Sequence, residues 1–337
     1  MRSDPPQATT VALSFAKAVN AALHRALTEC PETVLYGEDL AKPGGVFGVT
    51  KNLQAEFGAR RVFDTPISET AMLGAAVGAA MTGLRPIVEI MWIDFSLVAM
   101  DQIVNQAANV RYVSAGRLAA PLTIRTQQGA TPGSCAQHSQ NLEALYAHVP
   151  GLRVGVAATA QDAYSMLLAA IGCDDPTLII ENRALYHGEE QSVVIDGPIE
   201  SAEGARIARE GQDLTLVTWG PMLYQALAAA RQLSAEGIEA EVINARWIAP
   251  FDWSALFGSV SRTRRLLVVH EANVSGGFGA EIAARVQREL FGQLAAPVER
   301  LGVDNCRMPA APHLQAALIP DAVRIAERAR QLWAGRA

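Results

Sequence analysis

Several features that often identify the class of a protein are missing from this chain of 337 residues. Its four cysteines lie far apart and form no Cys-x-x-Cys pair, so neither a disulfide framework nor a zinc site is expected. No block of lysine and arginine occurs, and the formal net charge is −6. Nucleic acid and anionic membranes are therefore not expected as partners.

Segments that would direct the chain to a membrane are also missing. The first ten residues contain no apolar core and do not resemble a signal peptide. The longest apolar run, 71–84, is too short to span a bilayer. We therefore expect a cytoplasmic protein that has no membrane partner.

Short motifs for three common kinds of chemistry are absent as well. The sequence has no phosphate-binding P-loop, no Gly-x-Ser-x-Gly turn around a nucleophilic serine and no His-Glu-x-x-His zinc motif. The six histidines are scattered, and the spacing of His138 and His148 does not suit one metal ion. The chemistry must therefore be sought in the organisation of the fold.

Segments of strand length alternate with segments of helical period along almost the whole chain. Several expected strands are apolar on both faces, which is typical of a parallel sheet covered by helices. A polar stretch with glycine and proline, 187–212, interrupts the alternation and indicates a linker. We therefore predict two α/β domains with parallel sheets, a larger one over 10–186 and a smaller one over 213–334. The expected helices are 14–29, 49–58, 69–83, 94–113, 140–148, 160–173, 222–237, 252–263, 279–292 and one that begins at 320, and the expected strands are 33–39, 61–64, 86–92, 121–127, 152–159, 176–182, 214–220, 239–246, 265–272 and 297–303.

The stretch Asp-Thr-Pro-Ile-Ser-Glu at 64–69 places an acid between an expected strand and a helix made almost wholly of small residues. Ser68 is expected to cap that helix and Gly83 to end it. The alanine and glycine stripes of the helix would allow a second helix or a flat ligand to approach its backbone closely. Taken alone, Glu69 has two interpretations: it complements the helix dipole in a tightly packed structure, or it belongs to a binding site.

Polar and aromatic residues follow several of the expected parallel strands. Because ligands bind at the carboxyl ends of such strands, the segments 38–39, 64–69 and 92–95 are expected to converge on one site. His138 lies in a loop after another strand, where it could join that site or be structural. A glycine-rich run, 275–282, opens a later helix and partly resembles a dinucleotide-binding turn, but its third glycine is replaced by isoleucine. A tight turn, or an anion or subunit contact, is the interpretation we favour there.

Eight motifs stand along the chain in this order: YGED, GGVFGVTKNL, RVFDTPISE, GAAVGAAMTGLRPIVEI, DFSLVAMDQIVNQAANVRY, AQHSQ, HVPGLRV and EVINARWIAPFD. Together they resemble the beta subunits of thiamine-diphosphate-dependent 2-oxo acid dehydrogenases, from about residue 10 to residue 330. That family includes the pyruvate, branched-chain 2-oxo acid and acetoin enzymes. The resemblance implies a transketolase-like pyrimidine-binding domain followed by a transketolase C-terminal-like domain.

The resemblance also implies partners and cofactors. In this family an α2β2 heterotetramer binds thiamine diphosphate between its subunits, decarboxylates a 2-oxo acid and transfers the acyl group to a lipoyl-bearing acyltransferase component. The alpha subunit holds the diphosphate and Mg²⁺, and the beta subunit contacts the aminopyrimidine ring. The present sequence contains no Gly-Asp-Gly, with which the metal motif begins, and offers no other cluster of diphosphate ligands. We therefore expect half a site, active only with the alpha subunit.

Individual residues acquire roles through the resemblance. Glu69 matches the catalytic glutamate that shares a proton with N1′ of the aminopyrimidine. Phe95 matches the aromatic residue that packs on this ring. His138 matches a histidine of the channel for the lipoyl arm, with a role in proton transfer or intermediate stabilisation during acyl transfer. A structural K⁺ site of relatives, built mainly from backbone carbonyls, falls on Leu122, Ala170, Ile171, Cys173 and Asp175, where Cys173 and Asp175 replace the Asp and Asn of some relatives.

The substrate stays open at the level of sequence. The run 44–53 is similar to acetoin enzymes and 270–282 to branched-chain enzymes, while Trp92 and Ile93 stand where relatives often have other residues. An acetoin-cleaving beta subunit is therefore an alternative. Two further alternatives are a non-catalytic interaction subunit, against which the three matched site residues argue, and a nucleotide-dependent dehydrogenase that uses the glycine-rich run.

Overall fold

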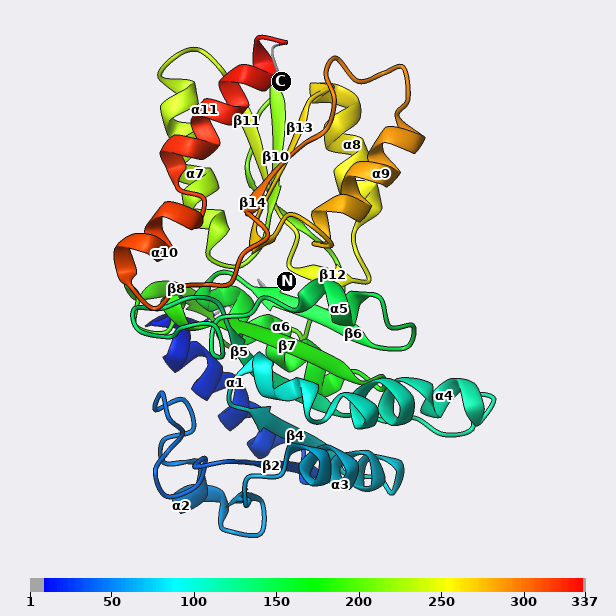
Figure 1. Ribbon diagram of the computed structural model, residues 1–337. Helices are drawn as coiled ribbons and strands as arrows, with labels where there is room; N and C mark the ends of the chain where they lie inside the picture. The colour runs from blue at the N-terminus through cyan, green and yellow to red at the C-terminus, as the bar shows by residue number, and fades with distance from the viewer. Residues whose placement is uncertain (1–8, 336–337) are drawn as a thin grey trace, which may run out of the picture.

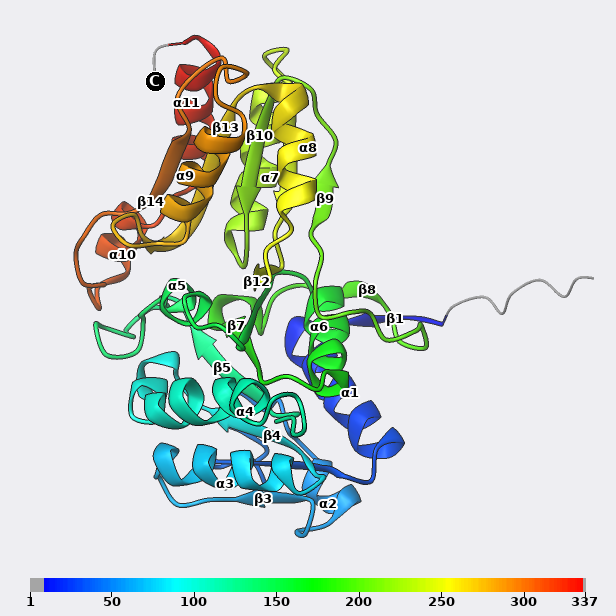
Figure 2. The ribbon, with the colours of Figure 1, turned by 90° about the vertical axis from the view of Figure 1, so that its right-hand side faces the viewer.

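Two sheets, one above the other, organise the computed structural model, which describes residues 9–335 (Figure 1). Each sheet is mostly parallel and carries helices on both faces (Figure 2). The predicted fold class, two α/β units with parallel sheets, is confirmed. Within residues 9–335, no helix combines the length and the apolar character needed to cross a bilayer.

The first sheet has seven strands in the order β12-β6-β7-β5-β4-β2-β3. The strands from the first half of the chain are parallel, whereas β12 (Trp247–Ala249) pairs antiparallel with β6 (Arg153–Ala157). Gly155 makes room for this pairing, because a Cβ atom there would lie 2.9 Å from the Trp247 ring. The second half of the chain therefore completes the sheet of the first half. The other strands are β2 (Thr33–Gly37), β3 (Val62–Asp64), β4 (Arg85–Ile90), β5 (Thr123–Gln128) and β7 (Thr177–Asn182), and the helices of this unit include α1 (Phe15–Glu29), α2 (Leu53–Phe57), α3 (Glu69–Met81), α5 (Glu143–Ala147) and α6 (Ala160–Gly172).

The second sheet has five strands in the order β14-β13-β10-β11-β9, and only β9 (Arg206–Arg209) is antiparallel to its neighbour. The stretch interpreted as a linker contains β9 and also β8 (Gln191–Val194), which pairs with β1 (Thr10–Leu13). These strands are short and their partners are distant in sequence, so local periodicity does not reveal them. The remaining elements are β10 (Leu214–Thr218), β11 (Ala240–Asn244), β13 (Leu266–Asn273), β14 (Glu299–Val303), α7 (Met222–Ser234), α8 (Trp253–Thr263), α9 (Gly279–Glu289), α10 (Pro312–Leu318) and α11 (Ala322–Trp333).

The segment 94–113, expected as one regular helix, is helical but irregular, because its pitch changes along its length. The side-chain amide of Asn109 donates to the carbonyls of Val104 and Asn105, at 3.4 and 3.2 Å, and competes with regular helical hydrogen bonds. A π turn of this kind often lies next to a functional site. The turns are η1 (Ile93–Leu97, 3₁₀), η2 (Gln102–Gln106, π), η3 (Ala107–Asn109, 3₁₀) and α4 (Val110–Val113), and a further 3₁₀ turn, η4 (Arg183–Leu185), follows β7.

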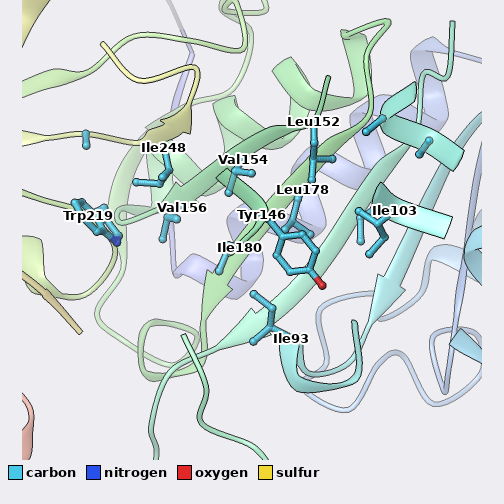
Figure 3. Close-up of a cluster of buried hydrophobic side chains, with 14 of the residues drawn as sticks. Ile93, Ile103, Tyr146, Leu152, Val154, Val156, Leu178, Ile180, Trp219 and Ile248 are labelled. Carbon is cyan, nitrogen blue, oxygen red and sulfur yellow. The ribbon is translucent and has the colours of Figure 1, made fainter. Parts of the chain in front are cut away.

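A buried apolar cluster begins between the first sheet and the segments that cover it and continues into the second unit (Figure 3). Aliphatic side chains of β6 and β7 contribute to it, and Trp219 and Ile248 join it from the second half of the chain. The Tyr146 hydroxyl forms a hydrogen bond of 2.5 Å with Ser96 Oγ in η1. The turn η1, which carries Phe95, is therefore anchored to this buried cluster through Tyr146.

Candidate active site

Residues that follow β2, β3 and β4 lie together at one edge of the first sheet. The backbone N–H of Ala41 donates to Asp64 Oδ1 at 2.7 Å, which joins the segments after β2 and β3. Thr70 Oγ1 donates to the Val98 carbonyl at 2.7 Å, which joins the start of α3 to the end of η1. The three segments that were expected to converge are thus neighbours in the fold.

Glu69 is the first residue of α3 and is only 7% exposed. Within residues 9–335, its carboxylate has no hydrogen-bond or ion-pair partner. Ser68 occupies the N-cap position of α3 as expected, although its side chain makes no capping hydrogen bond. Gly83, with a φ of 103°, follows the end of the helix as expected. A largely buried glutamate therefore follows the carboxyl end of β3, and its unpaired carboxylate oxygens are not sealed from solvent.

Glu38 brings a second acid to this edge, directly after β2. Burial raises the pKa of the Glu38 carboxyl, and the negative charges of Glu69, Asp39 and Glu89 raise it further. A hydrogen-bond donor placed among these acids would relieve their mutual repulsion. The local electrostatics therefore suit a ligand that presents a protonated nitrogen.

An aromatic wall, formed by Phe47, Trp92, Phe95 and His138, lies after β2, β4 and β5. The His138 ring meets Trp92 and Phe95 edge-on, with ring centroids 5.2 and 5.5 Å apart. Phe47 meets Trp92 edge-on at 5.3 Å, and the Arg183 guanidinium lies over the Trp92 ring. The structure thus places His138 beside Phe95.

Phe47, which belongs to the aromatic wall, and Arg183, which lies over it, were not singled out from the sequence. Arg183 follows β7, and its Nη2 donates to Thr131 Oγ1 at 2.6 Å. The rule that residues after parallel strands gather at one edge would have pointed to Arg183. Phe47 gave no comparable signal, because it lies in a glycine-rich loop well beyond the end of β2.

The residues matched to a cation site lie around the end of α6 and the starts of β5 and β7. Thr177 donates its backbone N–H to the Leu122 carbonyl at 2.9 Å, which brings these segments together. The Arg85 guanidinium donates to the carbonyls of Ile171 and Cys173, at 3.0 and 3.1 Å. Because a carbonyl oxygen has two lone pairs, these contacts leave room for a further ligand, and the K⁺ site stays a prediction. Within residues 9–335, no group of three or more His, Cys, Asp or Glu side chains is arranged to hold a metal ion.

The glycine-rich run packs on a buried histidine. His270 on β13 is fully buried, and a Cβ atom at Gly277, Gly279 or Gly302 would lie within 3.0 Å of its ring. These glycines are therefore required for packing between β13, β14 and α9, which favours the tight-turn interpretation of this run.

Comparison with known proteins places both halves of the chain. The family models "Transketolase, pyrimidine binding domain" and "Transketolase, C-terminal domain" match residues 11–189 and 203–325. The chain is 43% identical over 324 residues to pyruvate dehydrogenase E1 component subunit beta-2, mitochondrial, of Oryza sativa subsp. japonica, a match that covers 94% of this chain and 86% of the relative. It is 40% identical over 334 residues to acetoin:2,6-dichlorophenolindophenol oxidoreductase subunit beta of Cupriavidus necator, with 96% and 98% covered. A solved structure described as a split gene transketolase, inactive beta4 tetramer, shares the fold with a TM-score of 0.79 and 24% identity, over 97% of this chain and 100% of that chain.

Proposed function

Because the chain belongs to the transketolase-like beta subunits of 2-oxo acid dehydrogenases, we propose that it supplies the aminopyrimidine half of a thiamine diphosphate site. Together with an alpha subunit it forms an enzyme that decarboxylates a 2-oxo acid and passes the acyl group to a lipoyl-bearing acyltransferase component. The first unit, 10–186, provides the site residues, and the second, 213–334, supports them across the linker.

The observation that carries this proposal is the largely buried residue Glu69, whose carboxylate has no partner within residues 9–335 and lies close enough to Glu38 to raise the pKa of that acid. Such a carboxylate is suited to share a proton with a ring nitrogen, N1′ of the aminopyrimidine. When bound, thiamine diphosphate supplies the carbon nucleophile and the electron sink for decarboxylation. The task of Glu69 is to hold the proton at N1′.

The aromatic wall supplies the remaining functions of this half-site. The Phe95 ring is proposed to pack on the aminopyrimidine, and its position is set by the packed turn η1. His138 adjoins Phe95 and is proposed to transfer a proton, or to stabilise charge, when the acyl group leaves for the lipoyl arm.

The other half of the site is assigned to the alpha subunit. This sequence contains no Gly-Asp-Gly, so the diphosphate and Mg²⁺ are proposed to be held by alpha in an α2β2 heterotetramer. The exposed small residues Ala71, Ala75 and Gly78 of α3 suit close contact with a second subunit. A structural K⁺ is proposed at the carbonyls around the end of α6.

Acetoin is a second candidate substrate, since the Cupriavidus necator relative is named for it and covers almost the whole chain. The two candidates differ in the group released, carbon dioxide from a 2-oxo acid or acetaldehyde from acetoin. Product analysis with pyruvate, 3-methyl-2-oxobutanoate and acetoin would separate them.

The test of the proposal uses the chain co-purified with its alpha subunit. Glu69→Gln is expected to lower turnover by about 10²- to 10⁴-fold, the range for loss of a proton-transfer group. Calorimetry should still detect thiamine diphosphate binding to the variant. Glu281→Gln is the matched control, because Glu281 also lies in the first turn of a helix but is exposed and belongs to the second unit.

Two results would count against the proposal. Turnover of Glu69→Gln within tenfold of the wild-type value would remove Glu69 from the chemistry. If the wild-type pair bound no thiamine diphosphate, the chain would be a non-catalytic interaction subunit, and binding of a nicotinamide dinucleotide would favour the dehydrogenase alternative.

A further inference from the structure

The loop that carries His138 is held by a segment of the second unit. This loop, 129–140, follows β5, and the segment 304–315 follows β14. Their contacts involve the beginning, the middle and the end of the loop, so its path depends on the second unit. The hydrogen bonds run from Gln315 Nε2 to the Thr131 carbonyl (3.0 Å), from the Gly133 N–H to the Ala310 carbonyl (3.1 Å) and from Arg307 Nη1 to Gln140 Oε1 (3.0 Å).

Gln140 connects three parts of the molecule through one side chain. Its Oε1 accepts from Arg307 of the second unit, and its Nε2 donates to Asp94 Oδ1 at 2.9 Å. Asp94 is 8% exposed and directly precedes Phe95, and its Oδ2 is buried without a partner. A guanidinium can only donate and a carboxylate can only accept, so these two neighbours fix the orientation of the amide.

The His138 side chain needs such external support. Within residues 9–335 its ring makes no hydrogen bond, and it meets the rings of Trp92 and Phe95 edge-on. Contacts of this kind contribute about 0.5–1.5 kcal/mol each and do not fix a ring by themselves. The position of the ring is therefore set mainly by the backbone of the loop, which Gln140 fastens two residues further on.

We propose that Gln140 is a positioning residue for His138: by joining Arg307 to Asp94, it holds the His138 loop in register with the turn that carries Phe95. This inference rests on the proposed function. It assigns to the second unit, which contributes none of the matched catalytic residues, a direct part in placing one of them. A displacement of about 1 Å can lower the rate of a reaction by about 100-fold, so a single amide can matter this much.

The simpler interpretation is that Gln140 only fastens the two units together. The two interpretations differ in a double-mutant cycle, because a residue that acts through His138 has nothing left to position once His138 is absent. The experiment compares Gln140→Leu, His138→Ala and the double variant in the complex with the alpha subunit. Gln137→Leu is the matched control, since Gln137 is an exposed glutamine of the same loop.

Transfer of the acyl group to a lipoyl domain is expected to fall about 10- to 100-fold in Gln140→Leu. Reduction of 2,6-dichlorophenolindophenol, which bypasses the lipoyl arm, should fall less than fivefold. The double variant should be no slower than His138→Ala, and hydrogen–deuterium exchange of residues 131–140 should accelerate in Gln140→Leu but not in Gln137→Leu. Wild-type transfer in Gln140→Leu, or losses that multiply in the double variant, would overturn the proposal.

Arg307→Met provides a second route should Gln140→Leu not fold. Arg307 is exposed, so its loss should leave folding intact while releasing one end of the Gln140 amide. A three- to tenfold loss of transfer that disappears in the His138→Ala background is expected, and a loss that persists there contradicts the inference. If His138→Ala transfers the acyl group at the wild-type rate, the role proposed for His138 is wrong. If His138→Ala is slow but Gln140→Leu and Arg307→Met transfer at the wild-type rate, only the positioning role of Gln140 is wrong.

Discussion

The guanidinium carbon of Arg183 lies 4.0 Å from the centre of the Trp92 ring. Burial lowers the pKa of Arg183, while the nearby charge of Asp94 acts in the opposite direction. Trp92 in turn contacts His138, so a half-buried cation supports the aromatic wall from the β7 side. The arrangement links the start of η4 to the loop after β5 that carries His138.

Arg183→Met should therefore destabilise the wall and leave the rest of the fold intact. The methionine keeps an unbranched apolar side chain of similar reach but removes the charge over Trp92, which should cost about 0.5–2 kcal/mol. Urea unfolding of the chain measures this loss. Arg117→Met is the control, since Arg117 is an exposed arginine outside the wall, and an equal loss in both variants would contradict the assignment.

Arg125 should be essential to the stability of the first sheet. It is completely buried on β5, where it donates to Glu181 Oε1 and Oε2 at 2.8 Å and to Glu89 Oε2 at 2.5 Å. Arg125→Met removes the cation that pairs with two buried carboxylates, of which Glu181 keeps a hydrogen bond from the Tyr186 hydroxyl. Breaking a buried pair in this way costs about 3–5 kcal/mol. Denaturant unfolding should show this loss, and Arg125→Met combined with Glu89→Gln and Glu181→Gln should recover part of it. If the triple variant is no more stable than Arg125→Met, the loss of stability comes from altered packing and not from the unpaired charges.

The stability of the chain should fall as the solution becomes acidic, through His270. Burial lowers the pKa of His270 from 6.5 to about 4. A depressed folded-state pKa means that protons bind the unfolded chain more readily, so stability is complete above about pH 6.5 and is lost as pH falls towards 4. The pKa difference corresponds to roughly 3 kcal/mol. Unfolding midpoints between pH 7.5 and 4 measure this slope, and His270→Phe should flatten it, whereas an unchanged slope would assign the effect to other groups.

Potassium should stabilise the chain if the carbonyls around the end of α6 bind it. A specific ion at 100 times its Kd adds about 2.7 kcal/mol to the unfolding free energy. The melting temperature should therefore rise in KCl relative to NaCl or tetramethylammonium chloride at equal ionic strength. Identical melting temperatures in the three salts would show that hydrogen bonds such as those from Arg85 are the only ligands of these carbonyls.

The sequence predicts the regular elements of this protein well where a strand or helix has its own local pattern. The helix beginning after Ser14 and the strand that ends at Asp64 agree closely with α1 and β3. The strands β8, β9 and β12 were missed because each has four residues or fewer and pairs with a distant segment. The helical character of the segment from η1 to α4 was predicted, but its changes of pitch were not, because apolar spacing does not reveal side-chain hydrogen bonds such as those of Asn109.

The candidate site was only partly accessible from the sequence. Glu69, Phe95 and His138 were chosen through the resemblance, since the residues alone left Glu69 with an equally simple structural role. The support for His138 could not be predicted, because Gln140 and Arg307 are separated by more than a hundred residues and meet only through the packing of the two units. Such long-range polar contacts leave no trace in local spacing.

The strand β12 has a consequence for how this polypeptide can be divided. A fragment that ends within 187–212 would lack β12, and β6 would become an open edge with unsatisfied N–H and C=O groups. The surface beside Gly155, which the Trp247 indole covers in the intact chain, would also be exposed. Cleavage at the linker should therefore yield an aggregation-prone N-terminal piece and not an autonomous domain, so the two halves are separate in architecture but inseparable in folding.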